Sequence, residues 1–90
     1  MDKHYSIRVL GKVQGVFFRA LSKEKADELG ITGFVRNEPA GDVYIEAEGE
    51  EDSIQQLIIW CRTGPPRAVV EAVRANEGTV VGYKEFSVHR

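Results

Sequence analysis

The segment from Gly11 to Arg19 combines glycines with an arginine in a pattern that could bind a phosphate. It reads Gly11-Lys12-Val13-Gln14-Gly15-Val16-Phe17-Phe18-Arg19. Glycines allow left-handed backbone conformations, so successive N–H groups can turn toward one anion. A helix that starts here would add unpaired N–H groups and a favourable dipole, and the guanidinium of Arg19 could donate two parallel hydrogen bonds to a phosphate. The spacing alone leaves open a purely structural turn, with Arg19 in solvent or paired with a carboxylate.

A second informative segment runs from Gly33 to Val43 and carries Asn37 at the predicted end of a strand. Asn37 is followed by Glu38-Pro39-Ala40-Gly41-Asp42, which has the composition of a hairpin turn. Asparagines at such places commonly cap the turn, so this role stays open beside a functional one. Strand alternation places Val35 and Asn37 on the same face.

Hydrophobic periodicity predicts five strands and two helices. The predicted strands cover residues 5–10, 31–37, 43–48, 67–75 and 85–89, and the predicted helices cover residues 17–29 and 51–63. The order β-α-β-β-α-β with an added terminal strand indicates an α+β, ferredoxin-like fold, also called a split βαβ. We expect two helices on one face of a mostly antiparallel sheet, and one domain over residues 1–90.

The same periodicity predicts which side chains are buried. On the third strand Val43, Ile45 and Ala47 should face the core, while Tyr44, Glu46 and Glu48 face water. The helices should bury Phe18, Leu21, Ala26, Leu29, Ile54, Leu57, Ile58 and Cys61. We expect Trp60 in the core or at its rim, and His4 and His89, near the chain ends, on the surface. The acidic residues Glu46, Glu48, Glu50, Glu51 and Asp52 are interpreted as solvated surface and not as a cation site.

Composition excludes several classes of function. The formal net charge of −2 gives no overall attraction to nucleic acid or to an anionic membrane. The outer face of the predicted sheet lacks the aromatic pair and basic surround expected of RNA binding. The single cysteine, Cys61, allows neither an intrachain disulfide nor a zinc cluster. No apolar run is long enough to span a membrane, so we expect a cytoplasmic protein.

The two segments together resemble the signatures of the acylphosphatase family. The first signature resembles G-x-V-Q-G-V-x-[FY]-R, and its fixed positions are Gly11, Val13, Gln14, Gly15, Val16, Phe18 and Arg19. The second is matched by Gly33, Phe34, Val35, Arg36, Asn37, Gly41, Val43 and Gly49. The resemblance continues through Gly64-Pro65-Pro66 to Phe86-Ser87-Val88.

The resemblance implies hydrolysis of acyl phosphates to a carboxylate and inorganic phosphate, without metal or cofactor. It implies that Arg19 binds the phosphoryl group and that Asn37 orients the attacking water. The phosphate-binding backbone would come from Gln14, Gly15, Val16, Phe17 and Phe18, together with Arg19. The partner would be a small acyl phosphate, and a monomer is expected at this size. The alternative is a catalytically idle ferredoxin-like module that binds an anionic metabolite or a protein partner.

Three positions qualify the resemblance. Phe17 stands where glycine is common in the family, which predicts a stiffer loop or a narrower opening. Glu38, beside Asn37, carries a negative charge that would slightly repel an anionic substrate. Ser22 stands where relatives often carry threonine, and a supporting hydroxyl is a hypothesis.

Overall fold

The chain forms seven elements in the order predicted. The computed structural model describes residues 1–90, and its elements are β1 (Lys3–Lys12), α1 (Phe18–Leu29), β2 (Thr32–Asn37), β3 (Val43–Gly49), α2 (Glu51–Thr63), β4 (Val69–Gly78) and β5 (Phe86–Val88). Neither helix is both long enough and apolar enough to cross a bilayer.

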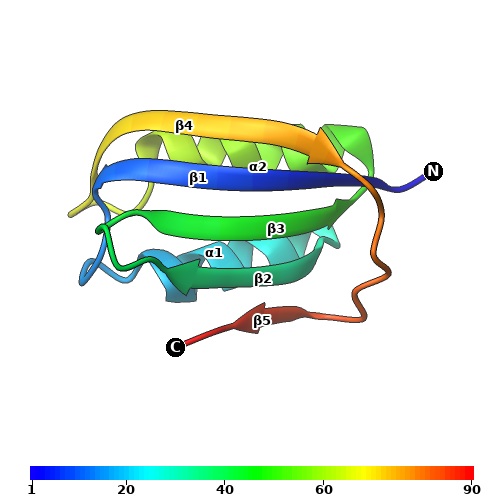
Figure 1. The fold of residues 1–90 in the computed structure, drawn as a ribbon, viewed down its shortest axis with the longest axis horizontal. Coiled ribbons are helices and arrows are strands. Elements are labelled where there is room, and N and C mark those ends of the chain that lie inside the picture. The colour runs from blue at the N-terminus through cyan, green and yellow to red at the C-terminus, as the bar shows by residue number, and fades with distance from the viewer.

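The strands form one five-stranded sheet in the order β4-β1-β3-β2-β5. β1 pairs antiparallel with β3 and β4, β2 pairs antiparallel with β3, and β5 runs parallel to β2. Both helices cover the same face of the sheet, with α2 behind β4 and β1 and α1 behind β2 and β3 (Figure 1). The predicted ferredoxin-like fold is confirmed. Because β2 and β5 are parallel, the chain end lies beside the end of β2 that carries Asn37.

The core lies between the sheet and the two helices, as the alternation of apolar residues predicts. Val43, Ile45 and Ala47 of β3 are fully buried, together with the predicted stripe of α2. Cys61 belongs to that stripe, and burial raises the pKa of its thiol to about 12. A thiol so protected from water and so hard to deprotonate serves packing, in agreement with its predicted place.

β1 and β4 extend past their predicted ends because each finds a partner beyond its alternating segment, although β4 begins at Val69, two residues later than predicted. β1 begins at Lys3 and ends at Lys12, and β4 reaches Gly78. The far end of β4 pairs with the start of β1, where His4 lies opposite Gly78. Backbone pairing extends both strands past the residues whose hydrophobicity marks a strand.

The buried stripe of α1 is centred differently from the prediction. Leu21 and Leu29 are only half-buried, whereas Ser22 is fully buried between Phe18 and Ala26. These three positions lie four residues apart and so share one face of the helix. The Ser22 hydroxyl donates a 2.6 Å hydrogen bond to the Phe18 carbonyl, which satisfies it inside the helix. Ser22 can therefore occupy a fully buried position on α1 without leaving an unpaired polar group.

The predictions of a surface His4 and a solvated Glu48 are wrong. His4 is 6% exposed and Glu48 is 2% exposed. His4 Nδ1 lies 2.7 Å from a Glu48 carboxylate oxygen, and His4 Nε2 contacts Glu46. The chain after β4 crosses over these side chains, and the Tyr83 ring stacks on His4. The sequence places all of these groups on the outer face of the sheet, but only the path of the segment after β4 buries them.

The Glu48 carboxylate anchors that crossing segment. It accepts hydrogen bonds from the N–H groups of Val81, of Gly82 at 2.9 Å, and of Tyr83 at 3.1 Å. Burial by itself would raise the pKa of Glu48, but these donors and His4 outweigh burial and lower the pKa to about 2. The ionised carboxylate therefore stabilises the connection that leads to β5.

The prediction that the outer face lacks an aromatic pair is also wrong. The rings of Phe34 and Tyr44 lie on neighbouring strands with centroids 6.1 Å apart. Arg8 and Arg36 each place a guanidinium carbon 4.9 Å from the Tyr44 ring centroid. Alternation within one strand cannot show this pair, because its members meet only through the β2–β3 register.

Glu48→Gln should destabilise the protein at neutral pH and weaken the pH dependence of its stability. A carboxyl whose pKa is lowered by folding stabilises the native state above its ordinary value of 4.5, and this contribution is lost as the pH falls toward 2. We expect the variant to unfold about 1–3 kcal/mol more easily at pH 7, because a neutral amide is a poorer acceptor for several donors. The difference from the wild type should shrink toward pH 2, as measured by urea unfolding between pH 7 and pH 2.

Glu24→Gln on α1 is the matched control, because Glu24 is exposed. It should follow the wild type at every pH. A Glu48→Gln difference that stayed constant from pH 7 to pH 2 would contradict the role given to the ionised carboxylate.

Candidate active site

The loop between β1 and α1 presents a row of unpaired N–H groups. Gly15 has φ +73° and Phe17 has φ +66°, so the chain turns through left-handed conformations on either side of Val16. The first hydrogen bond of α1 runs from Leu21 N–H to the Phe17 carbonyl at 3.1 Å. No N–H group from Gln14 to Phe17 donates to another residue, and the first N–H groups of a helix have no partner within the helix. These donors and the positive end of the helix dipole make the corner attractive to an anion.

Gly15 keeps this corner open. A Cβ built on Gly15 would have no neighbouring atom within 4 Å, so the residue faces free space. Its left-handed conformation would cost a residue with a Cβ about 1 kcal/mol. Glycine at this position therefore allows the left-handed turn and leaves the backbone N–H groups accessible to a ligand.

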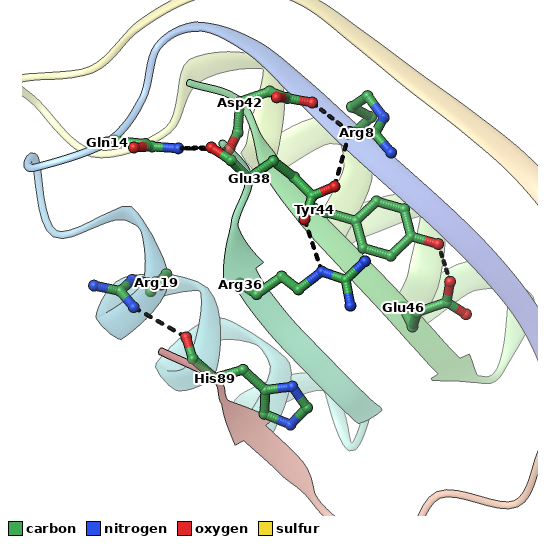
Figure 2. Close-up of polar contacts among 9 residues, drawn as sticks. All are labelled: Arg8, Gln14, Arg19, Arg36, Glu38, Asp42, Tyr44, Glu46 and His89. Carbon is green, nitrogen blue, oxygen red and sulfur yellow. Dashed lines mark hydrogen bonds and ion pairs between the residues drawn. The ribbon is translucent and has the colours of Figure 1, made fainter. Parts of the chain in front are cut away.

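Arg19 lies in the first turn of α1 and is held by the end of the chain. Its Nη1 donates a 2.9 Å hydrogen bond to the carbonyl of His89 (Figure 2). The His89 N–H in turn donates to the Val35 carbonyl of β2 at 2.8 Å, two residues before Asn37. The guanidinium is therefore tied to the strand that carries Asn37, and its other N–H groups remain free to bind an anion.

The turn after Asn37 is closed by other groups, so the asparagine side chain is not its cap. Glu38 N–H donates to the Asp42 carbonyl at 2.9 Å, and Gly41 N–H donates to the Glu38 carbonyl at 3.0 Å. The Gln14 carboxamide donates to the same two carbonyls, at 2.7 Å to Glu38 and 2.9 Å to Asp42 (Figure 2). Gln14 thus fastens the β1–α1 loop to the turn beside Asn37.

Arg19 and Asn37 lie on the wall of one cavity of about 410 Å³. The cavity is lined by Val13, Gly15, Phe17, Phe18, Arg19, Ala20, Asn37, Val88 and Arg90. Of the residues predicted to bind phosphate, Gly15, Phe17, Phe18 and Arg19 line it. The Gln14 side chain is bonded to the neighbouring turn and Val16 is buried, so these two residues can offer the site only their backbone N–H groups.

Sequence reasoning missed Val88 and Arg90 as residues of this cavity. They reach it because β5 runs parallel to β2 and ends beside the β1–α1 corner. Val88 stands in the matched segment Phe86-Ser87-Val88, but that match assigns it no role, and no signal in the sequence gives the neighbour of a three-residue strand. The Ser22 hydroxyl does not line the cavity, and its one bond is to the carbonyl of Phe18 within α1.

The wall of the cavity carries positive charge and no acid or base. Its polar side chains are two guanidiniums and one carboxamide, and it contains no His, Cys, Asp or Glu. Elsewhere in the chain, no three or more of these side chains are grouped so that they could hold a metal ion. The cavity can bind an anion and fix a polar molecule, but it offers no side chain for proton transfer.

The predicted repulsion by Glu38 is offset by two arginines on the outer face of the sheet. The Glu38 carboxylate lies 2.8 Å from Arg36 Nε and 3.3 Å from Arg8 Nη1. Arg8 also donates to Asp42 at 2.5 Å, which lowers the pKa of that carboxyl (Figure 2). Both carboxylates of the turn are therefore directed to cations and away from the cavity lining.

Comparison with known proteins identifies the family. The model of the family described as Acylphosphatase matches residues 5–88. The chain belongs to the acylphosphatase family. An acylphosphatase from Methylococcus capsulatus is 47% identical over 89 residues, which cover 98% of this chain and 97% of that protein.

Solved acylphosphatases have the same fold. A structure from Coxiella burnetii superposes with a TM-score of 0.95 at 45% identity and covers 98% of this chain and 93% of that one. A structure from Bacillus subtilis has a TM-score of 0.95 at 34% identity, with 100% of both chains covered. The family resemblance found in the two motifs is thus confirmed, and it extends over nearly the whole of this chain.

Gln14→Leu should loosen the turn beside Asn37. Leucine has a similar size but cannot donate to the two carbonyls, so we expect a loss of about 1–2 kcal/mol in the free energy of unfolding. Hydrogen exchange should become faster at the Glu38 and Gly41 amides, whose bonds close the turn. Gln55→Leu is the control, because Gln55 makes its 2.7 Å bond to Glu51 on the exposed side of α2. Unchanged exchange at both turn amides would show that Gln14 does not hold the turn.

Proposed function

We propose that this acylphosphatase binds the phosphoryl group of its substrate with Arg19 and the backbone between Gln14 and Phe18, and that Asn37 orients the attacking water. The protein hydrolyses acyl phosphates to a carboxylate and inorganic phosphate, as its family and its acylphosphatase relatives indicate. One observation carries the assignment of roles. Unpaired N–H groups of the β1–α1 loop, the guanidinium of Arg19 on α1 and the carboxamide of Asn37 at the end of β2 share one cavity.

The chemistry needs little beyond these groups. Water forms a bond to phosphorus while the bond from phosphorus to the acyl oxygen breaks, and its electron pair leaves with the carboxylate. A carboxylate is a stable anion, so no acid has to protonate the leaving group, and the proton lost from water passes to solvent. The transition state of phosphoryl transfer is loose, so the protein contributes mainly position and charge.

Charge stabilisation falls to Arg19 and the loop. The guanidinium can place two parallel N–H groups on the phosphoryl oxygens while Nη1 remains oriented by the His89 carbonyl. The N–H groups at the left-handed corner add donors that need no reorganisation during the reaction. Inorganic phosphate, the second product, would be held by the same groups.

Asn37 contributes geometry. Its carboxamide takes no part in the bonds that close the next turn, and it faces the cavity that contains Arg19. A carboxamide both accepts and donates hydrogen bonds, so it can hold water in line with the phosphorus without removing a proton. Gln14 keeps the strand end at the right distance from the loop.

We place the enzyme in the cytoplasm as a monomer that needs no metal and binds neither nucleic acid nor membrane. All groups assigned to the reaction come from one copy of the chain, and Cys61 is buried and unpaired, which suits a reducing compartment. The idle-module alternative is not favoured by any contact of the cavity.

Arg19→Ala should lower kcat/KM for benzoyl phosphate by about 10³- to 10⁵-fold, the contribution of a well-placed arginine in phosphoryl transfer. Arg19→Lys should also lose most activity, because an ammonium keeps the charge but lacks the planar fork. Hydrolysis is followed spectrophotometrically in excess EDTA. Arg62→Ala at the exposed end of α2 is the control and should retain full activity. Near wild-type turnover by the lysine variant would refute bidentate binding by Arg19.

Asn37→Ala should lower kcat by about 10²-fold, the usual cost of a misplaced reactant. Inhibition by inorganic phosphate should change less than about 3-fold, because phosphate is bound by Arg19 and the loop. Steady-state kinetics with phosphate as competitive inhibitor separate the two effects. A variant with unchanged kcat and much weaker phosphate binding would reassign Asn37 from the water to the anion.

A further inference from the structure

Phe17 combines a large, exposed aromatic ring with a left-handed backbone conformation. It is the one residue other than glycine with a left-handed backbone in the chain, at φ +66° and ψ +20°. A side chain in this conformation costs of order 1 kcal/mol, and such strain collects at functional sites. A glycine would avoid the cost at this corner, so the ring itself calls for an explanation.

Packing does not explain the ring. Phe17 is 71% exposed, whereas Phe18 and Phe86 are almost fully buried and the Phe34 ring stacks on His89 with centroids 4.6 Å apart. Phe17 makes no contact of this kind with another aromatic ring. It covers no part of the core cluster and is left at the surface of the cavity.

The cavity has apolar surface beside its polar groups. Phe17, Val88 and Ala20 contribute it beside the polar groups of Gly15, Arg19 and Asn37. Val88 is exposed as well, at the edge of the sheet. An acyl phosphate is itself divided, with an anionic phosphoryl group at one end and an acyl group at the other. Once the anion meets Arg19 and the loop, the acyl group must extend from them toward the exposed part of the cavity.

We propose that Phe17 binds the acyl group and makes the enzyme select acyl phosphates with apolar, above all aromatic, acyl groups. The inference depends on the proposed function, because it takes the phosphoryl group to lie at Arg19. An exposed aromatic face next to a second apolar surface is suited to stacking on a planar acyl group such as benzoyl. A small acetyl group would reach little of the ring. Phe17 is thus a specificity residue whose side chain touches the part of the substrate that leaves.

The test compares benzoyl phosphate with acetyl phosphate in the wild type and in Phe17→Ala, Phe17→Gly and Phe17→Tyr. The two leaving groups differ in intrinsic reactivity, but this difference is the same for every variant. The ratio of the two kcat/KM values should fall by about 3- to 10-fold in the alanine and glycine variants, the usual contribution of one aromatic contact. The tyrosine variant, which keeps the ring, should retain the wild-type ratio.

Inhibition by inorganic phosphate separates the ring from the backbone of the loop. Phosphate has no acyl group, so its inhibition constant should be the same in the wild type and Phe17→Ala. The glycine variant removes both strain and ring, so agreement between the alanine and glycine ratios attributes the selectivity to the ring. Ile59→Ala, at a residue 63% exposed on α2, is the matched control and should change nothing.

The outcomes distinguish the two proposals. If the wild type hydrolyses both substrates and the ratio is unchanged in Phe17→Ala, the role of Phe17 is refuted and the proposed function stands. An altered phosphate constant with an unchanged ratio would likewise refute it, because Phe17 would then act through the loop. If the wild type hydrolyses neither substrate, the proposed function fails, and this inference fails with it.

Discussion

Two hydrogen bonds from the Gln14 carboxamide hold the β1–α1 loop against the turn between β2 and β3. Arg19 and Asn37 come from two different elements, α1 and β2, and the proposed reaction requires the loop and the strand end to keep a fixed separation. The end of the chain makes a second connection, because His89 binds both Arg19 and the Val35 carbonyl. The cavity is therefore held from two sides, by the Gln14 side chain before α1 and by the His89 backbone after β5. This bracing allows a short loop to expose its N–H groups without collapsing onto its own carbonyls.

The arginines on the two sides of the sheet differ in whether they are paired with carboxylates. On the outer face, Arg8 and Arg36 pair with the carboxylates of the Asn37 turn and flank the Tyr44 ring. On the cavity side, positive charge is left without a carboxylate partner. An acidic chain can thus present a locally positive site, because the acidic groups nearest the site are directed to the other face. Phe17 adds an apolar surface at the edge of this positive cavity, which suits a substrate with one anionic and one apolar end.

Much of the fold could be predicted because the information is local. The periodicity of α2 and the alternation in β3 identify buried faces, and the order of elements limits the topology to a ferredoxin-like sheet. The two motifs also single out Arg19 and Asn37, and the fold brings both to one cavity, although their chemical roles remain predictions. What could not be predicted depends on contacts between distant segments. His4 and Glu48 are buried by a connection that has no periodicity, Phe34 meets Tyr44 through strand register, and Val88 and Arg90 reach the cavity through the parallel pairing of β5. Ser22 takes the central buried position of α1 in place of the leucines because its hydroxyl finds an acceptor within the helix, which hydrophobic periodicity cannot show.

The central claim is that unpaired backbone N–H groups and one guanidinium bind a tetrahedral anion at the β1–α1 corner. Titration of the ¹⁵N-labelled protein with inorganic phosphate, followed by amide chemical shifts, tests it directly. We predict saturable shifts concentrated at Gly15, Val16, Phe17, Phe18 and Arg19, with the same titration silent in Arg19→Ala. Shifts that instead clustered on the outer face of the sheet, around Arg8 and its cross-strand neighbour Arg74 on β4, or that persisted without the Arg19 side chain, would contradict the account.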